Sequence, residues 1–219
     1  MRVTKSIVLS RYNENIEWIK KYDNADLKIF VYNKGNGSLN ISGNNIVFQN
    51  RPNLGRESET YLNHIIVNYD NLSDLTIFTQ AHPFDNIPSF FDHVDYDLSL
   101  ETDSNYFNWY GENYQTCDEN GAPGIYPILS GHPNERGRTL KTMYEDVFGK
   151  SCPKEVIFKP NGSFCVSSDI ILKNKKEIYE NLNKFINYEE QINYEGIFKY
   201  NPYEGHAMER MWGLIFDIK

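Results

Sequence analysis

The residues from Ser10 to Glu14 form a polar cluster, Ser-Arg-Tyr-Asn-Glu, that directly follows a short apolar run. Such a run predicts a strand, and open α/β sheets bind their ligands at the carboxyl ends of strands. Asn13 or Glu14 would then contact a nucleobase and ribose, and Arg11 would contact a phosphate. The alternative is structural, with Asn13 capping a following helix and Glu14 compensating its dipole.

A second polar cluster, from Asn53 to Glu57, stands where a strongly amphipathic helix is expected to begin. Gly55 allows close backbone approach, and the exposed N–H groups of a helix start bind anions. Arg56 would add a bidentate grip on a phosphate. Glu57 and Glu59 lie in the same turn and would repel an anion, so ordinary dipole compensation is the alternative.

A third cluster, Gln80, His82 and Asp85, follows the apolar run from Leu75 to Gln80. Glutamine and neutral histidine are poor ligands for a hard cation such as Mg²⁺, whereas Mn²⁺ accepts a mixture of His and Asp. Either His82 and Asp85 hold a metal, or the site has none and cationic side chains neutralise the phosphates. The structural alternative is a histidine that packs on the neighbouring Pro83 and Phe84.

Glu209 is the candidate for proton transfer. In the stretch from His206 to Gly213, the residues Met208, Met211, Trp212 and Ile215 recur at helical spacing and predict a buried stripe. Glu209 lies at the border of that stripe, and Arg210 and His206 lie on the far side. A half-buried carboxylate has a raised pKa, which suits it to general-base catalysis. The alternative is a surface glutamate paired with a neighbour.

The composition excludes several classes of protein. The 219 residues are 40% hydrophobic and 24% charged, with a formal net charge of −8, which is typical of a globular chain and argues against a nucleic-acid binder. No apolar run is long enough for a membrane span or a signal peptide. Three cysteines match no zinc spacing and indicate reduced thiols. We therefore expect a cytoplasmic protein with no nucleic-acid partner.

The order of the predicted elements indicates the fold class. Strands are expected at Ser6 to Ser10, Leu27 to Tyr32, Ile46 to Gln49 and Leu75 to Gln80, and helices at Asn13 onward and Glu57 to Asn68. This alternation predicts a single α/β domain over residues 1–219, Rossmann-like, with a mostly parallel twisted sheet and helices on both faces.

The later part of the chain is predicted to contain a loop-rich segment followed by mixed elements. Residues 83–134 hold five prolines and many Asp, Asn and Tyr residues, so we expect long loops there, with solvated acidic residues and one strand-like piece at Ile125 to Leu129. Beyond it we expect helices at about 138–148 and 169–185, strands at 155–159 and 162–167, and a last helix that carries Glu209.

Several stretches taken together carry a family resemblance. The stretches SRYNENIEWI, VYNKG, NLGRESETYLNHII with NYDNL, TIFTQAHPFDN, NGSFCVSSDIIL and ERMWGLIF resemble the family known as domain of unknown function 3431. The resemblance runs from about Ile7 to Phe216 and is weakest between about 95 and 135. That family is similar to glycosyltransferases of the GT-A type, which implies a nucleotide-sugar donor.

The resemblance also implies site residues. It implies donor contacts at Tyr12, Asn13 and Glu14, a site wall at Gly55, Arg56 and Thr60, and a strand-end cluster at Gln80 and His82. GT-A enzymes usually carry Asp-x-Asp at this strand end to hold Mg²⁺ or Mn²⁺ against the diphosphate. The sequence here is Gln80-x-His82, so a metal-independent mechanism is equally compatible with the resemblance.

The mechanism that follows is an inverting sugar transfer. Glu209 would deprotonate an acceptor hydroxyl as it attacks the anomeric carbon, and Arg56, with Arg11 or Lys34, would stabilise the departing diphosphate. Aromatic residues of the middle segment would stack on a glycan or other acceptor, namely Tyr106, Trp109, Tyr110 and Tyr114, with Trp109 and Tyr110 as the acceptor-binding pair. Two other functions stay open: a non-catalytic nucleotide- or carbohydrate-binding relative, and a metal-dependent hydrolase that uses His82 and Asp85.

Overall fold

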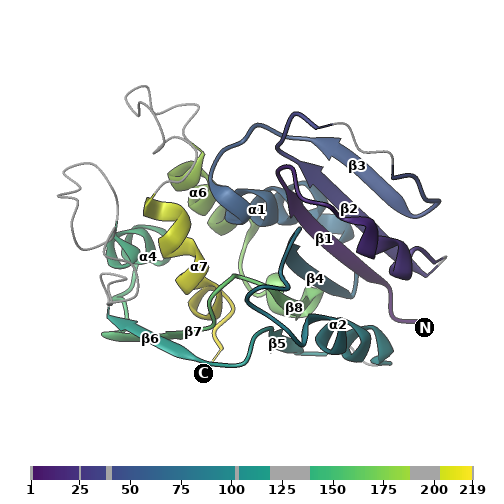
Figure 1. The fold of residues 1–219 in the computed structure, drawn as a ribbon. Helices are drawn as coiled ribbons and strands as arrows, with labels where there is room; N and C mark the ends of the chain where they lie inside the picture. The colour runs from purple at the N-terminus through teal and green to yellow at the C-terminus, as the bar shows by residue number, and fades with distance from the viewer. Residues whose placement is uncertain are drawn as a thin grey trace.

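The chain is organised around one six-stranded sheet. The computed structural model describes residues 2–24, 26–37, 41–101, 104–118, 139–187 and 203–218. The strands of the sheet, in spatial order, are β3 (Ile46–Asn50), β2 (Leu27–Asn33), β1 (Lys5–Arg11), β4 (Leu75–Gln80), β8 (Phe164–Ser167) and β5 (Phe107–Trp109) (Figure 1).

The sheet is mostly parallel. Strands β1, β2, β3 and β4 run in the same direction, with Lys5 opposite both Leu27 and Leu75. Strand β8 is antiparallel to both of its neighbours, β4 and β5. The carboxyl ends of the four parallel strands therefore meet at one edge of the sheet. The predicted mostly parallel α/β sheet is confirmed, and β8 is its one antiparallel strand within the described part of the chain.

Helices cover both faces of this sheet, as predicted. Strand residues alternate between the faces, so that Ile7 and Leu9 pack on one side and Val8 on the other. The first side is covered by the 3₁₀ helix η1 (Glu17–Tyr22) and by α2 (Phe90–Ser99). The second is covered by α1 (Arg56–Asn68), α4 (Leu140–Phe148), α6 (Lys176–Ile186) and α7 (Tyr203–Ile215) (Figure 1).

A small second sheet extends the α7 side of the molecule. Strands β6 (Gln115–Asp118) and β7 (Glu155–Phe158) pair in antiparallel register, and α7 packs against β7. The turn between β7 and β8 then returns the chain to the main sheet. This turn brings backbone groups close to the carboxyl end of β4.

The prediction of long loops over 83–134 is wrong for part of that segment. Helix α2 forms because Phe90 and Val94, four residues apart, are both fully buried. Asp97, expected in a solvated loop, is 1% exposed and accepts hydrogen bonds from the hydroxyls of Tyr106 and Tyr110. Strands β5 and β6 also lie in this segment, whereas Ile125 to Leu129 lies outside the described residues.

Two helix predictions need correction. No helix opens at Asn13, because the Glu14 carboxylate turns back and accepts the N–H groups of Tyr12 and Asn13, at 2.7 and 3.1 Å. The regular structure that follows is the short η1. The helix expected at 169–185 is two helices, α5 (Ser168–Ile171) and α6, separated by a turn. The α1 prediction is confirmed to within one residue.

Candidate functional site

A hollow of about 190 Å³ lies at the carboxyl ends of β1, β2 and β4. Its walls come from the ends of three strands and from the start of α1. The lining residues are Ser10, Arg11, Tyr12, Glu14, Lys34, Asn53, Arg56, Glu57, Gln80, Ala81 and His82. The three polar clusters found in the sequence, at 10–14, 53–57 and 80–85, therefore meet at one place.

A wider groove of about 1040 Å³ continues from this hollow toward β3. Tyr12, Lys34 and Asn53 line both spaces. Two aromatic side chains in the groove are accessible, since Tyr12 is 48% exposed and Phe48 42% exposed. The remaining lining is rich in amides, from Asn33, Asn36, Asn50 and Asn53. Together the two spaces form an elongated polar cleft with aromatic surface at one end.

Arg11 organises the loop that carries Tyr12. It is 5% exposed, and its Nε donates to the Glu14 carbonyl oxygen at 2.9 Å. Its Nη1 donates to Asn33 Oδ1 at 2.5 Å. Most of its hydrogen-bonding capacity is therefore spent on the protein itself. The structure gives Arg11 a supporting role beneath the cleft, where the sequence had suggested a phosphate contact.

Lys34 is likewise committed to internal partners. Its Nζ donates to the carbonyl oxygens of Leu54 and Arg56, at 2.6 and 2.5 Å, and forms an ion pair with Glu59 Oε2 at 2.8 Å. The side chains of Lys34 and Glu59 are 3% and 2% exposed. Burial lowers the pKa of Lys34, against the opposing effect of Glu59. Arg51 pairs with the other oxygen of Glu59. This network fixes the chain just before α1.

The start of α1 has an unusual backbone. Gly55 and Arg56 both have positive φ, 58° and 54°, and this conformation is costly for a residue with a side chain. A Cβ atom at Gly55 would lie 2.8 Å from both the Ile186 carbonyl oxygen and the Glu59 Cβ. From this turn the Arg56 side chain reaches α7. There Arg56 Nη1 lies 2.6 Å from His206 Nδ1.

Helix α7 presents Glu209 at this junction. The residue is half-buried, and its Oε1 accepts the backbone N–H of Asn161, in the β7–β8 turn, at 2.8 Å. Gln80, at the end of β4, donates from Nε2 to the Asn161 carbonyl oxygen at 3.2 Å. Burial, followed by the charge of Glu57, raises the pKa of Glu209, while Arg56, the Asn161 N–H and Arg210 oppose that rise. The predicted half-buried position is confirmed.

Arg210 and His206 do not both face outward as predicted. Arg210 is 3% exposed, donates to the His206 carbonyl oxygen at 2.7 Å and stands over the Phe158 ring at 4.9 Å. The prediction failed because α7 packs against β7 as well as the other helices, so it is buried on more than one face. Burial, Arg56 and Arg210 lower the pKa of His206 to about 3, so its ring is neutral at pH 7.

Glu57 is the site residue whose role the sequence did not reveal. It is 7% exposed, lines the hollow, and its Oε2 lies 3.5 Å from Arg56 Nε. Its Oε1 has no hydrogen-bond partner in the described part of the chain. One signal was available in the sequence: Glu57 stands four residues before Tyr61, on the apolar side of α1. Its place in the first turn suggested dipole compensation instead.

Three predicted contact residues belong to the core. Thr60 is fully buried, and its Oγ1 lies 3.1 Å from Ser10 Oγ, so it joins α1 to β1 beneath the hollow. Tyr110 is fully buried with its hydroxyl donating to Asp97 Oδ2 at 2.6 Å. Trp109 is 5% exposed and packs edge-on against Phe164. These positions give Trp109 and Tyr110 packing roles and leave no surface for stacking on an acceptor.

His82 and Asp85 form an exposed pair. His82 Nε2 lies 3.4 Å from Asp85 Oδ1, and the two side chains are 49% and 81% exposed. Within the described ranges, no group of three or more His, Cys, Asp or Glu side chains could hold a metal ion. The pair would therefore supply only two ligands, and the rest of the coordination would come from substrate and water.

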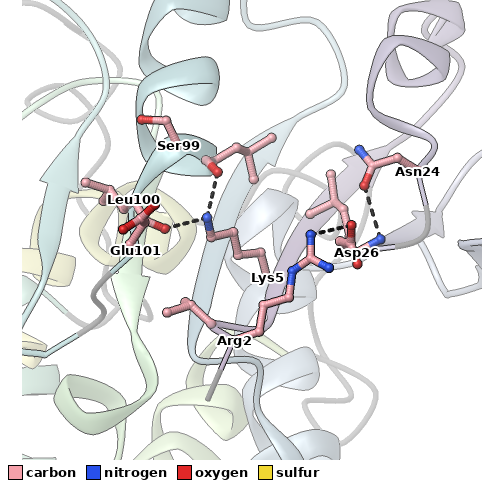
Figure 2. Close-up of a pocket in the computed structure, with 10 residues that line it drawn as sticks. Arg2, Lys5, Asn24, Asp26, Ser99, Leu100 and Glu101 are labelled. Atoms are coloured by element: carbon pink, nitrogen blue, oxygen red, sulfur yellow. Dashed lines mark hydrogen bonds and ion pairs between the residues drawn. The ribbon is translucent and has the colours of Figure 1, made fainter.

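A separate hollow of about 550 Å³ lies at the opposite edge of the sheet (Figure 2). Figure 2 shows Lys5 directed at the end of α2, where its Nζ donates to the carbonyl oxygens of Leu98 and Leu100, both at 2.6 Å. Arg2 pairs there with Asp26 at 2.6 Å. These charged groups therefore pair with each other or with backbone carbonyl oxygens. We therefore assign the candidate site to the carboxyl edge.

The fold and the site define an α/β protein with a mostly parallel sheet and a polar cleft at the carboxyl ends of its strands. Residues 7–219 match the family model described as "Protein of unknown function (DUF3431)", and the chain belongs to that family. No curated protein matches the chain. None of the helices described here is long and apolar enough to cross a membrane.

Proposed function

We infer that this chain is a glycosyltransferase of GT-A type that moves a sugar from a nucleotide-sugar donor to a hydroxyl acceptor. The observation that carries the inference is the elongated cleft at the carboxyl ends of β1, β2 and β4. Such an edge is where open parallel sheets bind nucleotides. The accessible faces of Tyr12 and Phe48 suit a nucleobase, and the amides around them suit a ribose.

The diphosphate would lie in the smaller hollow, beside the start of α1. Arg56 is the cation that reaches this space from the helix start, with its side chain 25% exposed. A guanidinium there would stabilise the charge that develops on the leaving diphosphate. Arg11 and Lys34 contribute by positive charge at a distance, since their hydrogen bonds hold the cleft walls in place. His82 and Asp85 would join only if a divalent ion arrives with the donor.

Glu209 would act as the general base. Its pKa is raised by burial, so it holds a proton more readily than a solvated glutamate. It would take the proton of the acceptor hydroxyl while that oxygen attacks the anomeric carbon. The bond from the anomeric carbon to the diphosphate would break on the opposite face, inverting the configuration. Glu209 is linked to the hollow through Asn161, whose N–H donates to Glu209 and whose carbonyl oxygen accepts from Gln80, a lining residue.

The experiment has a binding arm and a turnover arm. Calorimetry with free nucleoside diphosphates and nucleotide sugars, with Mn²⁺ and with chelator, identifies the donor class and any metal requirement. Transfer to a panel of hydroxyl acceptors is then measured for the wild type, Glu209→Gln and the exposed-helix control Glu177→Gln. Glu209→Gln is expected to keep donor affinity and to slow transfer by roughly 10²- to 10⁴-fold.

The other outcomes separate the alternatives. Tight nucleotide binding with no turnover of any donor would identify a non-catalytic relative of the fold. Hydrolysis that a chelator abolishes would favour the metal-dependent hydrolase. No binding of any nucleotide at millimolar concentration would overturn the inference.

A further inference from the structure

Glu57 is a buried glutamate in the wall of the hollow. The residue is 7% exposed, and its Oε1 has no hydrogen-bond partner among the residues that the structure describes. Leaving a buried polar atom unpaired costs free energy, more so for a charged group, so such an atom calls for a functional explanation. Its other oxygen faces Arg56 Nε at 3.5 Å. Among the described residues, one oxygen of this carboxylate therefore has a partner and the other has none.

This oxygen and Glu209 border the same glycine. A Cβ atom on Gly162 would lie 3.9 Å from Glu57 Oε1 and 3.9 Å from Glu209 Cγ, so both side chains lie next to Gly162. Gly162 has φ 55° and follows Asn161 at φ 83°, so two consecutive residues of this turn have positive φ. The Tyr61 hydroxyl, one helical turn after Glu57, is also buried without a described partner.

The charges around the two glutamates nearly balance. Arg56 and Tyr61 face them from α1, and Arg210 faces Glu209 from α7. His206, also on α7, contacts Arg56, and the Asn161 N–H donates to Glu209 from the β7–β8 turn. His206 is neutral at pH 7, and burial holds the pKa of Tyr61 well above its usual value, so that hydroxyl keeps its proton. Two arginines thus face two carboxylates. Even so, burial and Glu57 leave the pKa of Glu209 raised.

We propose that Glu57 is a positioning residue for Glu209, and that the two carboxyl groups hold between them the proton taken from the acceptor. The proposal rests on the transferase function. In the step, the acceptor O–H bond breaks and its oxygen bonds to the anomeric carbon, while the diphosphate leaves with the electron pair of the broken C–O bond. The proton passes to Glu209, and Glu57 Oε1 accepts a hydrogen bond from the protonated group.

The first test needs no substrate. Carbon-13 NMR of glutamate-labelled protein follows the titration of the Glu209 carboxyl, which Glu209→Gln assigns. In Glu57→Gln the Glu209 midpoint is expected to fall, because a neighbouring negative charge has been removed. Glu57→Asp keeps the charge and is expected to keep the midpoint raised. An identical Glu209 midpoint in wild type and Glu57→Gln would overturn the proposal.

A second variant guards against a Glu57→Gln protein that does not fold. If that variant is unfolded, Glu57→Asp decides the test, because it keeps the negative charge that raises the pKa of Glu209. A Glu209 midpoint in Glu57→Asp that falls to the value of a solvated glutamate would overturn the proposal.

The second test separates this proposal from the proposed function. Glu57→Gln is expected to move the acid limb of the kcat/KM profile to lower pH and to slow transfer roughly tenfold, since a weaker base remains. A merely structural role would lower the rate without moving the limb. If the Glu209 midpoint depends on Glu57 but no nucleotide binds, the transferase function is refuted and the interaction of the two glutamates stands. If Glu57→Gln transfers sugar at the normal rate and its acid limb has not moved, the role of Glu57 is refuted and the transferase function stands.

Discussion

The two edges of the central sheet both carry charged hollows, but the charges are used differently. At the amino edge, Arg2 and Asp26 are 77% and 52% exposed and pair in water, and Lys5 binds the carbonyl groups that end α2. At the carboxyl edge, Lys34 and Glu59 are almost fully buried, and Glu57 keeps an oxygen without a described partner. Buried and incompletely paired charge distinguishes the candidate site from the amino-edge hollow, whose charged groups are exposed or half-buried.

The buried lysine at the carboxyl edge should matter most for stability. Lys34→Met leaves Glu59 buried with Arg51 as its remaining ion-pair partner, and is expected to lower the free energy of unfolding by about 3–5 kcal/mol. Lys5→Met, the same change at the half-buried amino edge, is expected to cost about 1–2 kcal/mol. Urea denaturation measures both. Equal losses would mean that the two edges do not differ in this way.

The strained turn before α1 should give the next largest effect. Gly55→Ala forces a Cβ to within 2.8 Å of a backbone oxygen at positive φ, and is expected to cost about 3 kcal/mol. Gly149→Ala is the matched control, because Gly149 has φ 63° with nothing within 4 Å of its Cβ position. It is expected to cost only about 1–2 kcal/mol. Thermal unfolding of both variants measures the loss of stability in each. The excess loss in Gly55→Ala is the contribution of the clash, so equal losses would show that the clash has no effect.

The smallest effect is a change in the pH dependence of stability. The pKa of His206 falls from 6.5 to about 3 on folding, so the folded protein binds fewer protons than the unfolded chain between these values. The stability from this group is complete above pH 6.5 and is lost as the pH falls toward 3. His206→Gln keeps an acceptor for Arg56. In this variant the free energy of unfolding should fall less steeply as the pH is lowered, with a difference in slope of less than about 1.4 kcal/mol per pH unit, measured by urea denaturation at each pH.

His64 is the internal reference for that measurement. Burial lowers its pKa to about 3 as well, and its Nδ1 lies 2.9 Å from the Tyr32 hydroxyl in the core, away from the cleft. His206→Gln should therefore remove part of the acid sensitivity and leave the part that His64 supplies. A slope identical to that of the wild type between pH 6 and 4 would mean that His206 is not held neutral at the carboxyl edge.

The sequence predicted the parts of the molecule that follow local rules. Apolar runs located β1, β2 and β4, and the helical spacing of Tyr61, Leu62 and Ile65 located α1. Because parallel strands end at one edge, the polar residues after each strand could be placed together without coordinates. The buried stripe of α7 and the half-buried position of Glu209 were also predicted correctly.

What could not be predicted depends on partners distant in the sequence. Arg11 and Lys34 were predicted to contact phosphate because their residue types suit that role. In the structure Arg11 donates to Asn33 and Lys34 pairs with Glu59. Tyr110 was predicted to stack on an acceptor sugar. In the structure its hydroxyl donates to Asp97, which comes from a segment that was expected to be a loop. Glu57 lies close to Gly162 of the β7–β8 turn, about 100 residues later in the chain, and no local pattern predicts that proximity.

The contact between Arg56 and His206 joins residues 150 positions apart. Contacts this distant are slow to form, because the chain must lose loop entropy before the contact returns any energy. The parallel strands β1 and β2 close a much shorter loop and can assemble without α7. Refolding should therefore recover secondary structure before the two glutamates come together. The site is then among the last parts of the molecule to form during folding.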